Sequence, residues 1–195
     1  MLQSLGKDNC GKPNLPGTKI KLRLTEICEL ANGMPATRSE LVLAASGTPE
    51  VGDKKIYDEP FDFSAAASGE GYWREYDILV DTGSLNAMLE GEVGGQGFAN
   101  KIPFFIVGLG PAQLEIADDF VAHSNCLIAS IVSRDGIAYV IGRVDNPVTI
   151  ESAELTLGLK NGDRKGGAWV LNASEGYSPM TYDADTHGFD ITPNP

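Results

Sequence analysis

Asp81, Thr82 and Gly83 form the motif with the most specific chemical meaning in this chain. They follow the apolar run Ile78-Leu79-Val80, which predicts a strand that ends at the aspartate. An aspartate held on such a turn can share a proton with a second carboxylate, and such a pair can activate a water molecule for hydrolysis. The chain contains the motif once, so this chemistry would require two copies of the protein.

The motif resembles the active-site loop of aspartic proteases, and its single occurrence resembles the retroviral enzymes, which act as homodimers. Their second signature, two apolar residues before Gly-Arg, has a counterpart in Val140-Ile141-Gly142-Arg143. A helix expected over 111–124 and the long segment before Asp81 depart from that pattern. The alternative is an ordinary strand-ending turn, because Asp and Gly both favour turns for local steric and hydrogen-bonding reasons.

Other polar residues give weaker indications of a site. His123 and His187 have no carboxylate or histidine nearby at ligand spacing, and Cys10, Cys28 and Cys126 have no C-x-x-C spacing. The sequence therefore predicts no metal, no cofactor and no disulfide framework. We expect a protein that is not an enzyme, with the protease as the alternative.

The charge distribution argues against direct binding to the phosphates of nucleic acid. The chain has 27 acidic and 15 basic residues and a net charge of −12, and Lys101 is the only base between Glu75 and Ser133. Binding to phosphates needs clustered cations, whereas an acidic surface can face DNA in order to repel it. The apolar runs are shorter than the ~20 residues of a membrane-spanning helix, so we expect no membrane span.

The hydrophobic pattern predicts a mainly β protein, a β-sandwich or barrel with one flanking α-helix. Alternation predicts a strand at 20–24, and a hairpin at 126–142 turns at Asp135-Gly136. Pro111 suits the first turn of a helix over 111–124. That helix should bury Leu114, Ala117, Phe120 and Val121. Further strands are expected at 40–45, 54–63, 71–81, 102–107, 148–159 and 168–173.

The chain is expected to hold one domain, over 18–183, between a flexible arm at 1–17 and a C-terminal tail at 184–195. A long loop is expected over 82–101, because this segment is rich in glycine. Four of the apolar residues of this loop are candidate anchors in polar surroundings, which either contact another copy or pack on their own domain. These residues are Leu85, Met88, Leu89 and Phe98.

The order of turns and elements resembles the major tail tube proteins of long-tailed bacteriophages, over about Thr18 to Asp183. The features that carry the resemblance are the Gly91-Glu92-Val93 to Gly97-Phe98 loop, the strand from Ile102 that ends at Gly108, the helix with Phe120, the hairpin from Cys126 to Gly142, Thr156 to Gly158, and Asn161-Gly162-Asp163-Arg164-Lys165-Gly166.

The resemblance implies a virion structural protein that is made in the host cytoplasm and assembles into stacked hexameric rings. DNA would pass through the tube without specific binding, and other tail or connector proteins would end it. The 82–101 loop would be the contact between rings. Candidate acids for the lumen are Glu90, Glu92, Asp118 and Asp119. The sequence leaves a carbohydrate- or protein-binding sandwich open as a third class.

Overall fold

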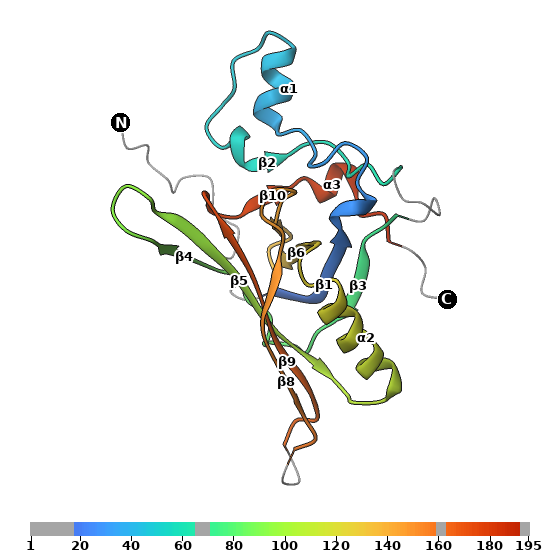
Figure 1. The fold of residues 1–195 in the computed structure, drawn as a ribbon. Coiled ribbons are helices and arrows are strands. Elements are labelled where there is room, and N and C mark those ends of the chain that lie inside the picture. The colour runs from blue at the N-terminus through green and yellow to red at the C-terminus, as the bar shows by residue number, and fades with distance from the viewer. Residues whose placement is uncertain (1–17, 65–70, 159–162, 192–195) are drawn as a thin grey trace.

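The computed structural model describes residues 18–64, 71–158 and 163–191 (Figure 1). The expected arm at 1–17 and the Asn161-Gly162 turn lie outside these residues. The elements, in chain order, are β1 (Thr18–Glu26), η1 (Ile27–Glu29), α1 (Arg38–Ala44), η2 (Asp53–Lys55), β2 (Ile56–Tyr57), β3 (Arg74–Asp77), β4 (Asn86–Glu90), β5 (Gly97–Val107), α2 (Pro111–Ala122), β6 (Leu127–Ser133), β7 (Ala138–Ile141), β8 (Thr149–Thr156), β9 (Gly166–Glu175), β10 (Met180–Tyr182) and α3 (Ala184–His187).

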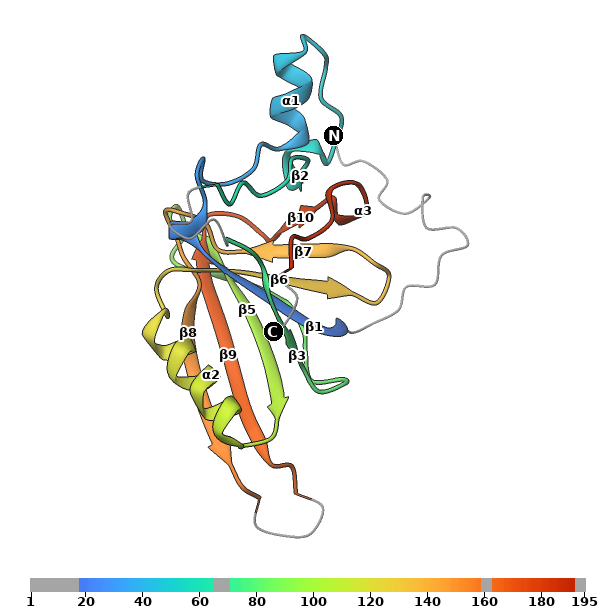
Figure 2. The same ribbon diagram turned by 90° about the vertical axis from the view of Figure 1, so that its right-hand side faces the viewer.

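The strands form two sheets, which confirms the mainly β fold. One sheet has six strands in the order β2-β10-β7-β6-β1-β3, and the other has four in the order β4-β5-β9-β8. The strands of the two sheets cross one another (Figure 2). All strand pairs are antiparallel except β2 with β10. In that parallel pair, the partner of the short strand β2 lies more than a hundred residues later in the chain.

The main core lies between the sheets and under α2. Phe120 of α2 packs edge-on against Tyr76 and Trp169, with ring centroids 5.0 and 5.2 Å apart, and against Phe104 at 6.4 Å. The helix therefore covers the inner face of the four-stranded sheet beside the six-stranded one (Figure 2). The other buried side chains of this core include Leu22, Leu24, Ile102, Ile131, Val148 and Leu171.

A second core covers the opposite face of the six-stranded sheet. It is rich in aromatic rings, with Trp73 at its centre, and is closed by the segment around Phe61 and by Phe189 near the C-terminus. Strand β6 contributes to both cores, since Ala129 and Ile131 face the first and Ile128 and Val132 the second. This explains why β6 is a nearly continuous apolar run, with its first six residues buried.

The helix expected at 111–124 is present as α2, but its buried face differs from the expected one. Ala117 and Phe120 are buried, whereas Leu114 and Val121 are 44% and 65% exposed. Ile116 packs against the core instead. The buried face is narrower than expected, because the helix lies at the rim of the sandwich.

The prediction of a strand at 40–45 is wrong, because this segment forms α1. Thr37 caps the helix: its backbone N–H donates to Glu40 Oε2 at 2.7 Å, and its hydroxyl accepts from the Glu40 N–H. This reciprocal cap outweighs the β-preferring pattern of the apolar residues. The strand expected at 54–63 is reduced to the two residues of β2.

The prediction of a long loop at 82–101 is also wrong, because most of this segment belongs to the hairpin of β4 and β5. Gly83 lies before β4, and the other four glycines of the segment lie in the turn and at its borders. Gly91 and Gly94 have φ angles of 102° and 99°, which other residues rarely adopt. A Cβ at Gly91 would lie 2.7 Å from the Gly95 carbonyl oxygen, so the turn is tight.

Candidate functional site

The β4–β5 hairpin projects from the body at one end of the four-stranded sheet (Figure 1). All five residues of β4 are exposed. Met88 and Leu89 are 49% and 57% exposed, and Val93 in the turn is 97% exposed. Met88 and Leu89 are adjacent in the strand and lie on opposite faces, so the hairpin exposes an apolar side chain on each face and one at its tip, where another molecule could contact them.

The structure separates the four apolar residues expected in the contact. Met88 and Leu89 are available to a partner, and Phe98 is the half-buried cross-strand neighbour of Leu89. Leu85 instead packs against the main core of its own chain. Val93 was missed, because a loop tip gives no periodic signal in the sequence.

Strands β4 and β8 are the two edges of the four-stranded sheet. Each strand of this sheet is antiparallel to its neighbour, so β4 and β8 run in opposite directions. An edge strand presents backbone N–H and C=O groups that can pair with a strand of another chain. If two copies lie side by side in the same orientation, β4 of one can therefore pair antiparallel with β8 of the other.

The outer face of this sheet, which points away from the core, is acidic. Directly opposed residues share a face, and by this rule Glu90, Lys101 and Glu154 lie on the outer face together. Glu151 reaches the same face, where its carboxylate lies 2.7 Å from Lys101 Nζ. The sequence analysis missed Glu151 and Glu154, because their common face depends on an irregularity in β8 between Ile150 and Ser152.

The four acids expected in a lumen do not share one surface. Glu90 lies at the end of β4, and Glu92 is exposed in the hairpin turn. Asp118 and Asp119 are exposed on α2, which covers the inner side of the same sheet. Figure 1 shows the hairpin and α2 on different sides of the molecule. Only Glu90 lies on the acidic sheet face.

The Asp81-Thr82-Gly83 motif forms a turn between β3 and β4. Asp81 has a φ of 62°, its side chain is 72% exposed, and its carboxylate pairs with Arg134 in the β6–β7 turn. The Thr82 hydroxyl donates to the Leu79 carbonyl oxygen at 2.6 Å. Gly142 follows β7 at the other end of that hairpin. This geometry favours a structural turn, because the carboxylate faces solvent and a cation.

We expect Asp81→Asn to change the free energy of unfolding by less than about 1 kcal/mol, since an exposed ion pair contributes little and Asn tolerates a positive φ. Asp81→Ala should be the more destabilising of the two, because a left-handed conformation costs Ala about 1–2 kcal/mol. Urea unfolding of both variants tests this order. Peptide hydrolysis by the wild-type protein that vanishes in Asp81→Asn would contradict the structural role.

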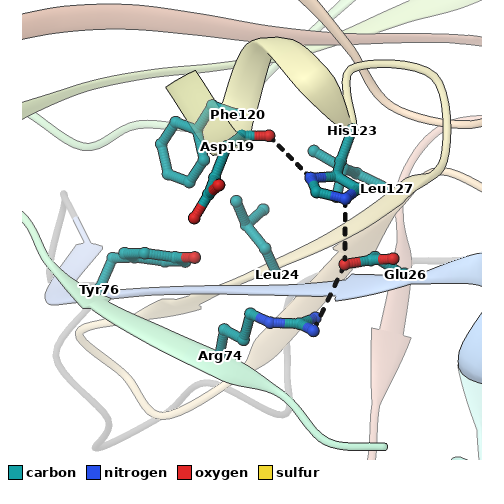
Figure 3. A pocket seen from close by; sticks show the side chains of 8 residues that line it. All are labelled: Leu24, Glu26, Arg74, Tyr76, Asp119, Phe120, His123 and Leu127. Atoms are coloured by element: carbon teal, nitrogen blue, oxygen red, sulfur yellow. Dashed lines mark hydrogen bonds and ion pairs between the residues drawn. The ribbon is translucent and has the colours of Figure 1, made fainter. Parts of the chain in front are cut away.

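A pocket of about 140 Å³ lies between α2 and the six-stranded sheet (Figure 3). His123 Nε2 is 4.0 Å from Glu26 Oε1, and the same oxygen is 3.3 Å from the Arg74 guanidinium, which also pairs with Glu29. His123 Nδ1 lies 2.9 Å from the Asp119 carbonyl oxygen. These groups tie β1 and β3 to the end of the helix.

The chemistry of this pocket is limited by its size and its groups. Substrate pockets usually enclose 300–1,000 Å³, so there is room here only for a few water molecules or a small ion. Burial raises the pKa of the Tyr76 hydroxyl to about 12, so this group stays protonated near neutral pH. We interpret the cluster as structural.

A second polar cluster is buried where β5 and β9 meet. The Glu175 carboxylate accepts a hydrogen bond from Asn100 Nδ2 at 2.6 Å and lies 3.7 Å from Arg143 Nε. Burial raises the pKa of Glu175 above its usual range, although Asn100 and Arg143 act against this. The Arg143 guanidinium also lies 4.8 Å from the centroid of the Tyr177 ring.

Two further features bear on function. Within the described residues, no group of three or more His, Cys, Asp or Glu side chains could hold a metal ion, and no helix there is long and apolar enough to cross a membrane. Comparisons of the chain with protein-family models, curated proteins and solved structures found no match.

Proposed function

We propose that the protein is a self-assembling structural subunit that forms the tail tube of a long-tailed bacteriophage. The observation that carries this proposal is the pair of open, oppositely directed edge strands in the four-stranded sheet. A contact between two different surfaces of the same protein can repeat around an axis and close into a ring. Pairing of β4 with β8 is such a contact.

The acidic outer face of the sheet suits the wall of a channel. In a ring closed by β4–β8 pairing, this face of every copy lies on the same side of a continuous sheet. Glu90, Glu151 and Glu154 with Lys101 would line the lumen. DNA carries about one charge per 1.7 Å of its axis, so an acidic wall lets it slide without adhering. Asp118 and Asp119 would lie outside the lumen.

The number of subunits in a ring, the stacking of rings, the proteins that end the tube and the place of synthesis are taken from the sequence resemblance. The rings are hexameric and stack into the tube, which other tail or connector proteins terminate. The protein is made in the host cytoplasm and functions in the virion. Electron microscopy of the purified protein tests the core of this proposal. Rings or tubes no wider than roughly 100 Å are expected, on the scale of small domains about 25–30 Å across.

We expect a proline in β4 to block ring formation. The backbone N–H groups of Ala87 and Met88 point in opposite directions, one toward β5 and one toward the free edge. Of the two variants Ala87→Pro and Met88→Pro, one therefore removes a hydrogen bond to β5, and the other removes only the donor at the free edge. The variant that keeps the thermal stability of the monomer identifies the edge position. This variant should stay monomeric in sedimentation, since the edge can no longer donate that bond.

The same substitution in β8 supplies a second test of edge pairing. Of two adjacent positions, Ala153 and Glu154, the one whose proline variant keeps monomer stability should also prevent rings. Rings that form normally from stable proline variants of both strands would exclude β4–β8 pairing as the lateral contact.

A further inference from the structure

We propose that copies of the protein also dock end to end, with the basic, apolar β8–β9 end of one copy on the acidic, apolar β4–β5 end of the next. This inference rests on the self-assembly proposed above and names both surfaces of the axial contact. Its basis is that the two ends of the four-stranded sheet expose apolar side chains and carry opposite charge.

The first of these ends, the acidic end, consists of the β4–β5 hairpin and a hollow at its base. The hollow measures about 400 Å³ and is lined by Phe98 and Ala99, by four glycines, and by the polar side chains of Glu90, Gln96, Ser174 and Glu175. Glu92 and Val93 are exposed in the adjoining turn. From Leu85 to Asn100 the chain contains no Lys or Arg. This end therefore offers a recess with an apolar patch at Phe98 and Ala99 and with acidic side chains at its border.

The second of these ends, the basic end, lies at the end of β8 and the start of β9. Leu155 and Leu157 are 45% and 72% exposed, and Val107 at the end of β5 is 56% exposed. Arg164 and Lys165 are exposed beside them, and the Lys165 carbonyl oxygen accepts a hydrogen bond from the Gly108 N–H at 2.9 Å. Asp163 precedes this pair, so these three residues carry a net charge of +1.

The two ends lie at opposite extremes of one continuous strand. β5 pairs with β4 through Gly97 at the acidic end, and Val107 of β5 pairs with Gly166 of β9 at the basic end. The ten steps between Gly97 and Val107 span roughly 34 Å at the usual rise of a strand. Figure 1 shows the hairpin and the β8–β9 end pointing away from each other. One copy can therefore contact a second at one end and a third at the other.

Opposite surfaces at opposite ends produce an open, polar stack. A head-to-tail contact of this kind leaves an unoccupied surface at each end, so addition can continue without limit. Leu157 is the most exposed leucine of the basic end and is small enough to enter the hollow of the next copy. The charges select the direction, because like ends repel one another. The axial contact uses sheet ends, whereas ring closure uses sheet edges.

The experiment uses two charge-reversed variants of the full chain. Glu92→Lys with Gln96→Lys makes both ends basic without changing β4, and Arg164→Glu with Lys165→Glu makes both ends acidic. Each variant alone should form rings that do not stack, with the protein concentration for half-maximal tube formation raised at least about tenfold. An equimolar mixture should form tubes again, because each basic end then meets an acidic one. A mixture that fails to restore tubes would overturn the docking.

Three measurements complete the test. Asp118→Lys with Val121→Lys changes the net charge by the same amount as the first variant, but on α2, and should stack like the wild type. Leu157→Ser should fold normally but raise the concentration for tube formation. Rising salt should weaken stacking before it weakens rings, since exposed charges are screened. Tubes that form equally from all variants would overturn the docking but leave ring formation intact. A wild-type protein that forms neither rings nor tubes would overturn both proposals.

Discussion

Trp73→Ala is expected to lower the free energy of unfolding by about 3–5 kcal/mol, because it removes the largest fully buried side chain of the second core. The indole is 1% exposed, and its ring centroid lies 4.9 Å from that of Phe61 and 5.5 Å from that of Phe189. The backbone N–H of Trp73 donates to the Asp190 carbonyl oxygen at 2.8 Å, so the ring packs where the chain is already paired with the C-terminal segment. Loss of the ring should therefore loosen the contact between this strand region and the C-terminal segment.

Urea unfolding measures the total loss, and hydrogen exchange locates it. We expect faster exchange around Phe61 and in α3, with little change in β5 and β9 below the global unfolding limit. Trp73→Phe is the matched control, because it keeps an aromatic ring and should cost less. A Trp73→Ala variant within 1 kcal/mol of the wild type would show that the second core does not depend on this ring.

Phe120→Ala is expected to cost about 3–5 kcal/mol for a similar reason, but in the other core. Phe120 is 3% exposed and joins α2 to both sheets through Tyr76 and Trp169. No other aromatic residue lies on this helix. The cavity would lie directly under the helix, so α2 should lose its protection from hydrogen exchange before the strands do.

Val121→Ala is the control for this prediction, since the neighbouring valine is 65% exposed on the same helix. It should change stability by less than about 0.5 kcal/mol. Equal losses for Phe120→Ala and Val121→Ala would contradict the orientation of α2 described here. Equal exchange rates for α2 in the wild type and in Phe120→Ala would contradict its anchoring by this ring.

Local sequence signals predicted the elements whose period and turn residues agree. The 126–142 hairpin has both the apolar alternation and the Asp135-Gly136 turn, and it is confirmed as β6 and β7. The start of α2 at Pro111 was also predictable, because proline suits the first turn of a helix and helical spacing follows it. The segment 40–45 failed, because its apolar residues suggested a strand while the decisive signal was the cap formed by Thr37 and Glu40.

The hairpin of β4 and β5 could not be predicted from its own residues. Its glycines suggested a loop, but β5 is stabilised by ten residue pairs with β9, from Phe98↔Glu175 to Val107↔Gly166. These partners are about 60–80 residues away in the chain, and no local pattern contains them. The acidic sheet face was missed for the same reason, since it joins Glu90 of β4 to Glu154 of β8 across two other strands.

The place of β10 in the six-stranded sheet determines when the protein can fold during its synthesis on the ribosome. β10 lies between β2 and β7, and Thr181 and Tyr182 pair with Ile56 and Tyr57. The ribosome therefore completes β2 long before its partner strand exists. Domains rich in such distant pairings fold slowly and expose apolar surface meanwhile. The second core cannot close until nearly the whole polypeptide has been synthesised, so a nascent chain stalled before Met180 should remain a chaperone substrate.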